Sequence, residues 1–252
     1  MRVSFLLTAA VILAACDTPT APRSMHSSVD DSRVPAELRA AYREDASRLA
    51  LRDLQASGSN EILIPDEAVR PYYNALVLVY NATALPARDT VVDVYGIRTF
   101  PQPSTRSFFL IVAGDQVWAQ RLTHDTVPTG NALIDQLLAD YSLSFDHAFV
   151  LTNNRLLIVL RTAAPLNVAA LTSKFADASG VLSADPNGAC CDGNNIIGSI
   201  EASRILLDYS VGYGDCPAGC IGRRSYHFAV HEDGTVEYLG ASGSPPPRPG
   251  QP

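Results

Sequence analysis

Residues 225–239 read SYHFAVHEDGTVEYL, and this segment carries the clearest evidence on the fold. Apolar and polar side chains alternate on both sides of the EDG triplet, which predicts two antiparallel strands. A two-residue turn would set an apolar side chain opposite a glutamate. A three-residue EDG loop with a left-handed glycine instead pairs Val230 with Val236 and Phe228 with Tyr238. We therefore expect the three-residue loop.

Outward from this hairpin, helices alternate with strands that are joined mostly as hairpins. This pattern predicts the α+β class, with a mainly antiparallel sheet and several isolated helices, and not a doubly wound parallel sheet. Helices are expected over residues 35 to about 56, 71 to about 81, 129 or 131 to about 141, and 167 to about 176. Strands are expected over 90–98, 108–113, 116–122, 148–152, 155–161, 205–213, 225–231 and 235–239, and another is expected to begin at 180.

Two further hairpins are expected from their turn residues. Gly114-Asp115 would join strands 108–113 and 116–122, and Asn153-Asn154 would form a two-residue turn after strand 148–152. The succession of strand, helix and strand that follows is similar to half of a ferredoxin-like fold, although this pattern is common to many folds.

The chain opens with one arginine and an apolar run up to Ala15, which predicts a signal peptide over residues 1–15. The run is shorter than the roughly 20 residues that span a bilayer. The tetrapeptide Leu13-Ala14-Ala15-Cys16 resembles the lipobox of bacterial lipoproteins. The resemblance implies cleavage before Cys16, acylation of Cys16 and attachment to a lipid bilayer of the bacterial cell envelope, with the inner or outer membrane left open. The alternative is an ordinary signal peptide that happens to contain a cysteine.

The mature chain divides by composition. Residues 16–34 are rich in Ser, Thr, Pro and Asp and predict a lipidated tether. Residues 35–240 predict a globular α+β body, either undivided or split into two subdomains near 187–200. Residues 241–252 are rich in proline and predict a disordered tail.

Charge and motifs exclude several classes of function. The formal net charge is −7 and no dense run of lysine and arginine is present, which argues against nucleic-acid binding. The sequence has no G-x-S-x-G elbow, H-E-x-x-H motif or phosphate loop. We therefore assign no catalytic residue, no metal ligand and no cofactor from the sequence.

Four cysteines remain beside Cys16, and export favours their oxidation to disulfides. A local Cys216–Cys220 bond is favoured because the intervening Pro and Gly supply a bend, and it would staple the C-terminal β region. Its complement is a vicinal Cys190–Cys191 bond or two free thiols. The other two pairings would cross-link the two loops. A redox pair is a weaker interpretation, because three residues and not two separate Cys216 from Cys220. A zinc site is also weaker, because structural sites usually use two separated pairs and an exported protein would have to keep its thiols reduced.

The histidines give no metal site or triad by spacing. His227 and His231 share a strand face but lie roughly 13 Å apart, too far to share one ion. His124-Asp125 and Asp146-His147 are sequence neighbours, which rarely form a catalytic triad. Residues 191–199 (CDGNNIIGS) lack the spacing of a calcium loop and predict a turn-rich loop.

The GDCPAGC segment (214–220), followed by the aromatic hairpin, resembles uncharacterised exported bacterial proteins, and this resemblance implies no activity. We expect a membrane-anchored envelope lipoprotein that acts as a non-enzymatic binding or structural module. Its ligand, a protein or a small molecule, is left open. The alternative is an exported hydrolase whose site is assembled from distant residues.

Overall fold

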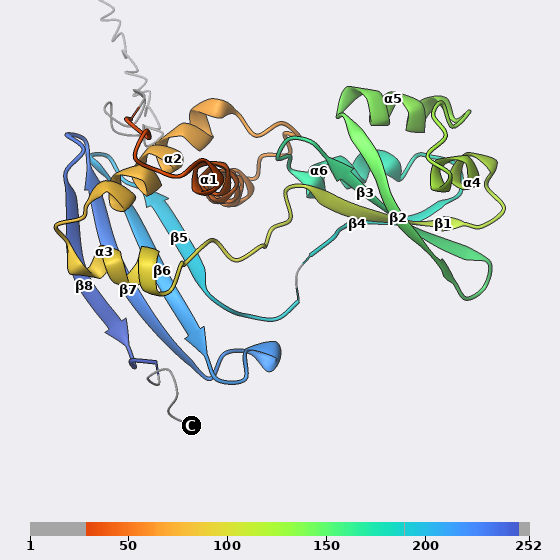
Figure 1. Ribbon diagram of the computed structural model, residues 1–252. Coiled ribbons are helices and arrows are strands. Elements are labelled where there is room, and N and C mark those ends of the chain that lie inside the picture. The colour runs from red at the N-terminus through yellow and green to blue at the C-terminus, as the bar shows by residue number, and fades with distance from the viewer. Residues whose placement is uncertain (1–28, 189, 247–252) are drawn as a thin grey trace, which may run out of the picture.

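The computed structural model of the protein describes residues 29–188 and 190–246. In these residues the chain forms two four-stranded antiparallel sheets that lie side by side, each with helices on one face (Figure 1). The α+β class predicted from the sequence is therefore confirmed.

The first sheet belongs to residues 107–186, which we call the middle unit. Its elements are β1 (Ser107–Ala113), α4 (Val117–Thr123), α5 (Ala132–Asp140), β2 (Leu143–Leu151), β3 (Arg155–Thr162), α6 (Val168–Phe175) and β4 (Val181–Pro186). The strands are ordered β2-β3-β1-β4, and each neighbouring pair is antiparallel. Strands β3 and β4 therefore run parallel on either side of β1, with α6 as their crossover. With α4 and α5 together in the place of the first helix, this is the βαββαβ order of the ferredoxin-like topology. The half suggested by the sequence therefore extends to the whole middle unit.

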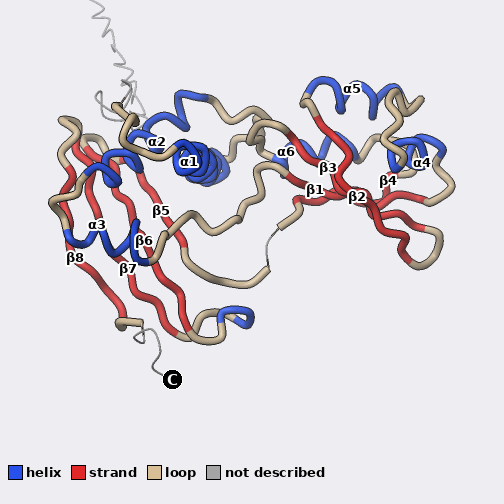
Figure 2. The backbone as a smooth tube through the Cα atoms, viewed as in Figure 1, coloured by secondary structure: helices blue, strands red, loops and turns tan. Residues whose placement is uncertain are grey.

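The second sheet belongs to residues 29–97 and 195–243, which we call the terminal unit. Its N-terminal elements are α1 (Ala36–Ala56), α2 (Asp66–Asn81), α3 (Pro86–Asp89) and the π-helical turn η2 (Thr90–Val94). Its C-terminal elements are β5 (Asn195–Ile200), β6 (Arg204–Tyr213), the 3₁₀ turn η3 (Cys216–Ala218), β7 (Gly222–His231) and β8 (Val236–Gly243). Helices α1 and α2 pack on one face of the β5-β6-β7-β8 sheet (Figure 2).

Each unit has its own hydrophobic core, one between α1, α2 and the second sheet and one between the first sheet and α4, α5 and α6. The chain enters the middle unit through residues 98–106, the first crossing segment, and leaves it through residues 187–194, the second crossing segment. The terminal unit is thus built from both ends of the described chain. Whether the units fold independently, as two subdomains with a boundary near 187–200, stays a prediction.

The β7–β8 hairpin has the predicted register. Val230 pairs with Val236, and Phe228 pairs with Tyr238. Gly234 adopts a left-handed conformation with φ of 83°, which closes the three-residue loop. The apolar side chains of both strands consequently face the same core.

Four asparagines lie at turns, as expected, with one difference in loop length. The side chains of Asn131 and Asn167 cap α5 and α6, because each accepts at least one hydrogen bond from a backbone N–H group of the first helical turn. Asn153 and Asn154 both have positive φ in the β2–β3 hairpin. The pairing register leaves three residues in that loop, beginning at Thr152, and not the two expected.

The expected strand over residues 90–98 is wrong. Residues 90–94 form the π-helical turn that continues α3. Val91 is fully buried in the core of the terminal unit, and Arg88 donates to the carboxylate of Asp93 one turn later. Burial and this ion pair therefore outweigh the strand preference of the valines.

The expected strand over residues 116–122 is also wrong, because these residues belong almost entirely to α4. Strand β1 pairs with β3 on one edge and β4 on the other, so no hairpin partner can be added after Gly114. In α4, Trp118 and Leu122 are buried one turn apart, and the Trp118 indole N–H donates to the carbonyl of Ser179 at 2.8 Å.

Several elements differ in their bounds, among them β2, which begins at Leu143 and not at residue 148. Strand β5 occupies much of the segment 191–199, where a loop is expected, because Ile196 is buried in the core while Ile197 faces solvent. Helix α2 begins at Asp66, five residues before the expected start, and contains Pro71.

The ends of the body also differ from expectation. Val34, expected in the tether, is 2% exposed and packs in the core of the terminal unit. Strand β8 runs to Gly243, so pairing extends three residues into the expected tail. Residues 1–28, which include the expected signal peptide and Cys16, lie outside the described residues, as do residues 247–252. Within the described ranges, no helix is both long and apolar enough to cross a bilayer.

Gly198 in β5 lies against the ring of Tyr72 in α2. A Cβ atom at position 198 would lie 2.5 Å from Tyr72 Cε1. Tyr72 is fully buried and its hydroxyl donates to Asp53, so the ring has no room to move. We predict that Gly198→Ala lowers the free energy of unfolding by about 1–3 kcal/mol, measured by urea denaturation. The control Ser199→Ala, at an exposed position, changes it by less than about 0.5 kcal/mol. Equal stability of the two variants would contradict the packing described.

Candidate functional site

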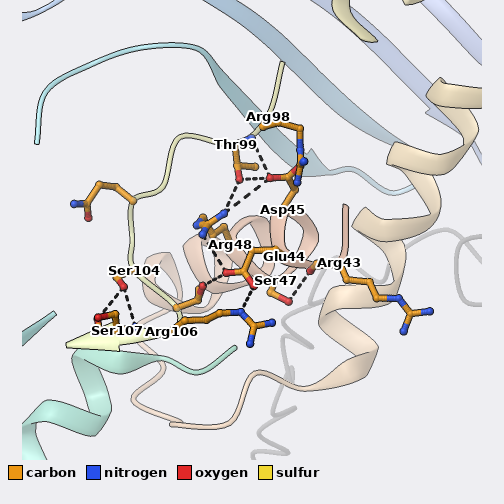
Figure 3. A network of polar contacts seen from close by, with 12 residues as sticks. Arg43, Glu44, Asp45, Ser47, Arg48, Arg98, Thr99, Ser104, Arg106 and Ser107 are labelled. Carbon is orange, nitrogen blue, oxygen red and sulfur yellow. Dashed lines mark hydrogen bonds and ion pairs between the residues drawn. The ribbon is translucent and has the colours of Figure 1, made fainter. Parts of the chain in front are cut away.

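One turn of α1 presents charged side chains to the first crossing segment (Figure 3). Asp45 is 1% exposed, and carboxylates are rarely buried unless they are paired. Its carboxylate accepts hydrogen bonds from the guanidinium of Arg98, from the backbone N–H of Thr99 at 3.1 Å and from the Thr99 hydroxyl at 2.5 Å. These contacts compensate the buried charge and hold the start of the crossing segment on α1.

Glu44, one residue earlier, holds the end of the same segment. Its carboxylate accepts hydrogen bonds from Arg48 at 3.0 Å, from the Thr105 hydroxyl and from Nε of Arg106. Arg106 also donates to the carbonyl of Ala163 in the middle unit. Glu44 therefore connects α1 to the residues that directly precede β1.

Arg52, two turns after Glu44, connects α1 to β5. Its acceptors are the carbonyl oxygens of Ile196 (2.7 Å), Gln102 (2.8 Å) and Phe100 (3.3 Å) and Oδ1 of Asn195 (3.3 Å). Burial, and then the positive charge of Arg48, lower the pKa of Arg52. The guanidinium thus fixes both the crossing segment and the edge strand of the second sheet.

A cavity of about 430 Å³ lies beside this cluster, and we call it the junction cleft. It is lined by Glu44, Arg48, Pro101, Ser104, Thr105, Arg106, Ser107, Asn187 and Gly188. These residues come from α1, from both crossing segments and from β1. Clefts where two packed units meet are frequent ligand sites.

Arg48 distinguishes the junction cleft from other hollows on the surface. Its Nε is buried and has no hydrogen-bond partner among the described residues. Another cavity, of about 400 Å³, is lined by residues that include Asp31, Arg43 and Tyr73. None of its described lining residues has a buried polar side-chain atom without a hydrogen-bond partner. A buried, unsatisfied donor is costly, which makes the junction cleft the candidate binding site.

The four cysteines of the described chain form two disulfides. Cys216 is bonded to Cys220, which is the favoured local pairing, and Cys190 is bonded to Cys191. The loop-to-loop pairings are therefore not formed. Among the described residues, no group of three or more histidine, cysteine, aspartate and glutamate side chains is placed to hold a metal ion.

Asp192 braces the region around the two disulfides. Its carboxylate accepts from Arg223 and from the backbone N–H groups of Gly193 (2.7 Å) and Cys220 (3.3 Å). The Arg223 hydrogen bond, followed by the backbone ones, lowers the pKa of Asp192. Arg223 also donates to the hydroxyl of Ser210 at 2.8 Å. This acidic residue of the 191–199 segment therefore has a structural partner.

The histidines of the described chain contact separate partners. His227 lies beside Asp208, and Nε2 of His231 is 3.1 Å from Glu237, so these two histidines do not converge on one ion. His147 contacts its neighbour Asp146 at 2.7 Å. Nδ1 of His124 lies 2.8 Å from the carbonyl of Gln120, and no hydrogen bond joins its ring to an acidic side chain of the described residues.

His227 also contacts a residue that the sequence does not indicate. Its Nε2 lies 2.9 Å from the hydroxyl of Ser242. Ser242 falls in the expected disordered tail, so no strand register connects it to His227 in the sequence. Ser242 could have been found only by extending the predicted last strand through Gly240, as β8 is extended in the structure.

Comparison of the chain with protein-family models, with curated proteins and with solved structures gives no match. The function is therefore argued from the residues of this chain alone.

Proposed function

We propose that the protein is a lipid-anchored lipoprotein of the bacterial envelope whose body binds a small anionic ligand in the junction cleft. The anchor is supported by the lipobox-like residues Leu13 to Cys16. Twelve residues separate Cys16 from Val29, the first described residue. Such a segment reaches at most roughly 40 Å, which keeps the body close to the bilayer.

The class of ligand follows from the charges that line the cleft. Arg48 and Arg106 contribute two guanidinium groups, and Glu44 contributes one carboxylate. The observation that carries the proposal is that both guanidinium groups belong to residues lining one cleft, and Arg48 has in addition a donor, Nε, without a partner among the described residues. A carboxylate or phosphate oxygen is the acceptor that a guanidinium binds best. The ligand therefore carries such oxygens and is small enough for a cavity of about 430 Å³.

The alternative function, an exported hydrolase, requires different residues. Among the described residues that line the junction cleft, none is a histidine. The acid, the base and the hydroxyl that a hydrolase needs lie together on the second sheet, where Asp208, His227 and Ser242 are in contact.

The anchor is tested by intact-mass analysis of protein extracted from membranes. We predict a chain that begins at Cys16 and carries acyl groups, since the thiol of that residue is the acceptor in the lipobox resemblance. Cys16→Ala is the control, and it should lack acyl groups. An unacylated wild-type chain that begins at any other residue would contradict the anchor.

The ligand is tested by calorimetric titration of the full protein with inorganic phosphate and with succinate. We predict saturable binding of at least one of them. Arg106→Gln should weaken it about tenfold or more, because one charge-assisted hydrogen bond contributes about 1.5–3 kcal/mol.

The matched control is Arg161→Gln, which removes an exposed arginine of β3 that pairs with Asp146 outside the cleft. Its affinity should equal that of the wild type. Absence of binding by both probes, or an Arg106→Gln variant that binds as tightly as the wild type, would refute the proposed ligand class. Circular dichroism of each variant shows whether the fold is retained.

A further inference from the structure

The outer face of the second sheet, opposite its helices, carries three reactive side chains on three adjacent strands. Asp208 in β6 pairs directly with His227 in β7, and His227 pairs with Gly240 in β8. Ser242 lies two residues after Gly240, on the same face of the sheet. The neighbouring Leu207 is buried in the core, which shows that the alternate positions face away from the helices.

The contacts run in one direction, from acid to base to hydroxyl. Nδ1 of His227 is hydrogen-bonded to Oδ1 of Asp208, and Nε2 of His227 lies 2.9 Å from Oγ of Ser242. An ionised carboxylate only accepts hydrogen bonds, so Nδ1 carries the ring proton. Nε2 of the neutral ring then has a free lone pair, to which the Ser242 hydroxyl donates. This is the hydrogen-bond order of a Ser-His-Asp triad, which is recognised by geometry and not by position in the sequence.

The hydroxyl is open to solvent. Ser242 is an exposed residue, and the side chains of His227 and Asp208 are 32% and 47% exposed. Gly240, opposite His227, has no side chain, and a Cβ atom built there would meet nothing within 4 Å. A substrate can therefore approach the Ser242 oxygen without displacing another part of the described chain at Gly240.

A second pair on the same face provides an internal comparison. His231 lies four residues after His227, and its Nε2 contacts Glu237 at 3.1 Å. No hydroxyl contacts that ring among the described residues. The His227–Asp208 pair thus has a serine hydroxyl on the second ring nitrogen, and the His231–Glu237 pair has none among the described residues.

We infer that Ser242, His227 and Asp208 form a nucleophilic serine site that hydrolyses exposed, activated esters, independently of the junction cleft. Oγ of Ser242 attacks the ester carbonyl while Nε2 of His227 takes its proton. The alcohol leaves with that proton, and an acyl-serine remains. His227 then takes a proton from water, the resulting hydroxide attacks the acyl carbonyl, and the carboxylic acid leaves as Ser242 regains its proton.

The substrate class follows from the exposure of the site. A nucleophile on an open sheet face is surrounded by water, so the developing oxyanion receives less stabilisation than in an enclosed site, where one donor alone contributes about 10²–10³ in rate. Esters with good leaving groups need less of this stabilisation than amides do. The site is therefore assigned to activated esters with unhindered acyl groups, with slow turnover.

The test is covalent labelling of the full protein with an alkyl fluorophosphonate, followed by peptide mass mapping. The expected result is phosphonylation of Ser242, with fluoride as the leaving group. Ser242→Ala should abolish that modification. Asp208→Asn leaves the serine in place but replaces the carboxylate with a neutral amide, whose N–H can donate to Nδ1 and favour the wrong His227 tautomer. It should slow labelling about tenfold or more.

Two control variants should label at the wild-type rate. Ser244→Ala removes an exposed serine two residues away, and His231→Gln removes the pair that has no hydroxyl. The site is overturned if Ser242 stays unmodified under conditions that fully label a serine esterase standard. It is equally overturned if Asp208→Asn labels as fast as the wild type while circular dichroism shows both proteins folded.

Discussion

The buried carboxylate of Asp45, together with that of Glu44 beside it, joins the two units of the protein. An ionised carboxylate that is 1% exposed is tolerated only when it is paired, because an unpaired buried charge costs several kcal/mol. Arg98 and Thr99 must therefore lie on α1, and the first crossing segment starts there. Glu44 then fixes the end of that segment through Arg106, directly before β1. One turn of α1 thus holds both ends of the segment that leads into the middle unit.

The same turn of α1 also creates the candidate binding site. Glu44 and Arg48 hold the crossing segment and at the same time line the junction cleft, so the cleft exists because the two units meet on this helix. Arg48 is left with one buried donor that no described residue satisfies. The outer face of the second sheet lies apart from this junction, and its Asp208, His227 and Ser242 come from β6, β7 and β8. The protein therefore has two separate candidate sites, the junction cleft and the outer face of the second sheet, and each is tested by its own variants.

The register of the final hairpin next to its loop was predictable, because only one register places Phe228 and Val230 with their apolar partners on one face. The pairing of β1 was not predictable, because β1 is a central strand whose two neighbours, β3 and β4, lie far away in the sequence. The turn residues at Gly114 wrongly indicated a hairpin with the residues that follow. Only part of the candidate site could be predicted from the sequence. Asp45 falls three residues after Tyr42 on the buried face of α1, which signals a buried charge, but its partners come from a segment without periodicity. Ser242 was missed because the glycines around it resemble a tail.

The coupling of the two units by α1 is tested most directly through the single tryptophan. Trp118 lies in the core of the middle unit, which does not contain α1, so its fluorescence reports that unit alone. The measurement is urea unfolding of the wild type and of the Glu44→Gln/Asp45→Asn variant, followed by Trp118 fluorescence and by far-ultraviolet circular dichroism. If α1 couples the units, the variant shifts the Trp118 midpoint to lower urea together with the circular dichroism midpoint. A Trp118 midpoint that stays at the wild-type value while the circular dichroism transition moves would contradict the account.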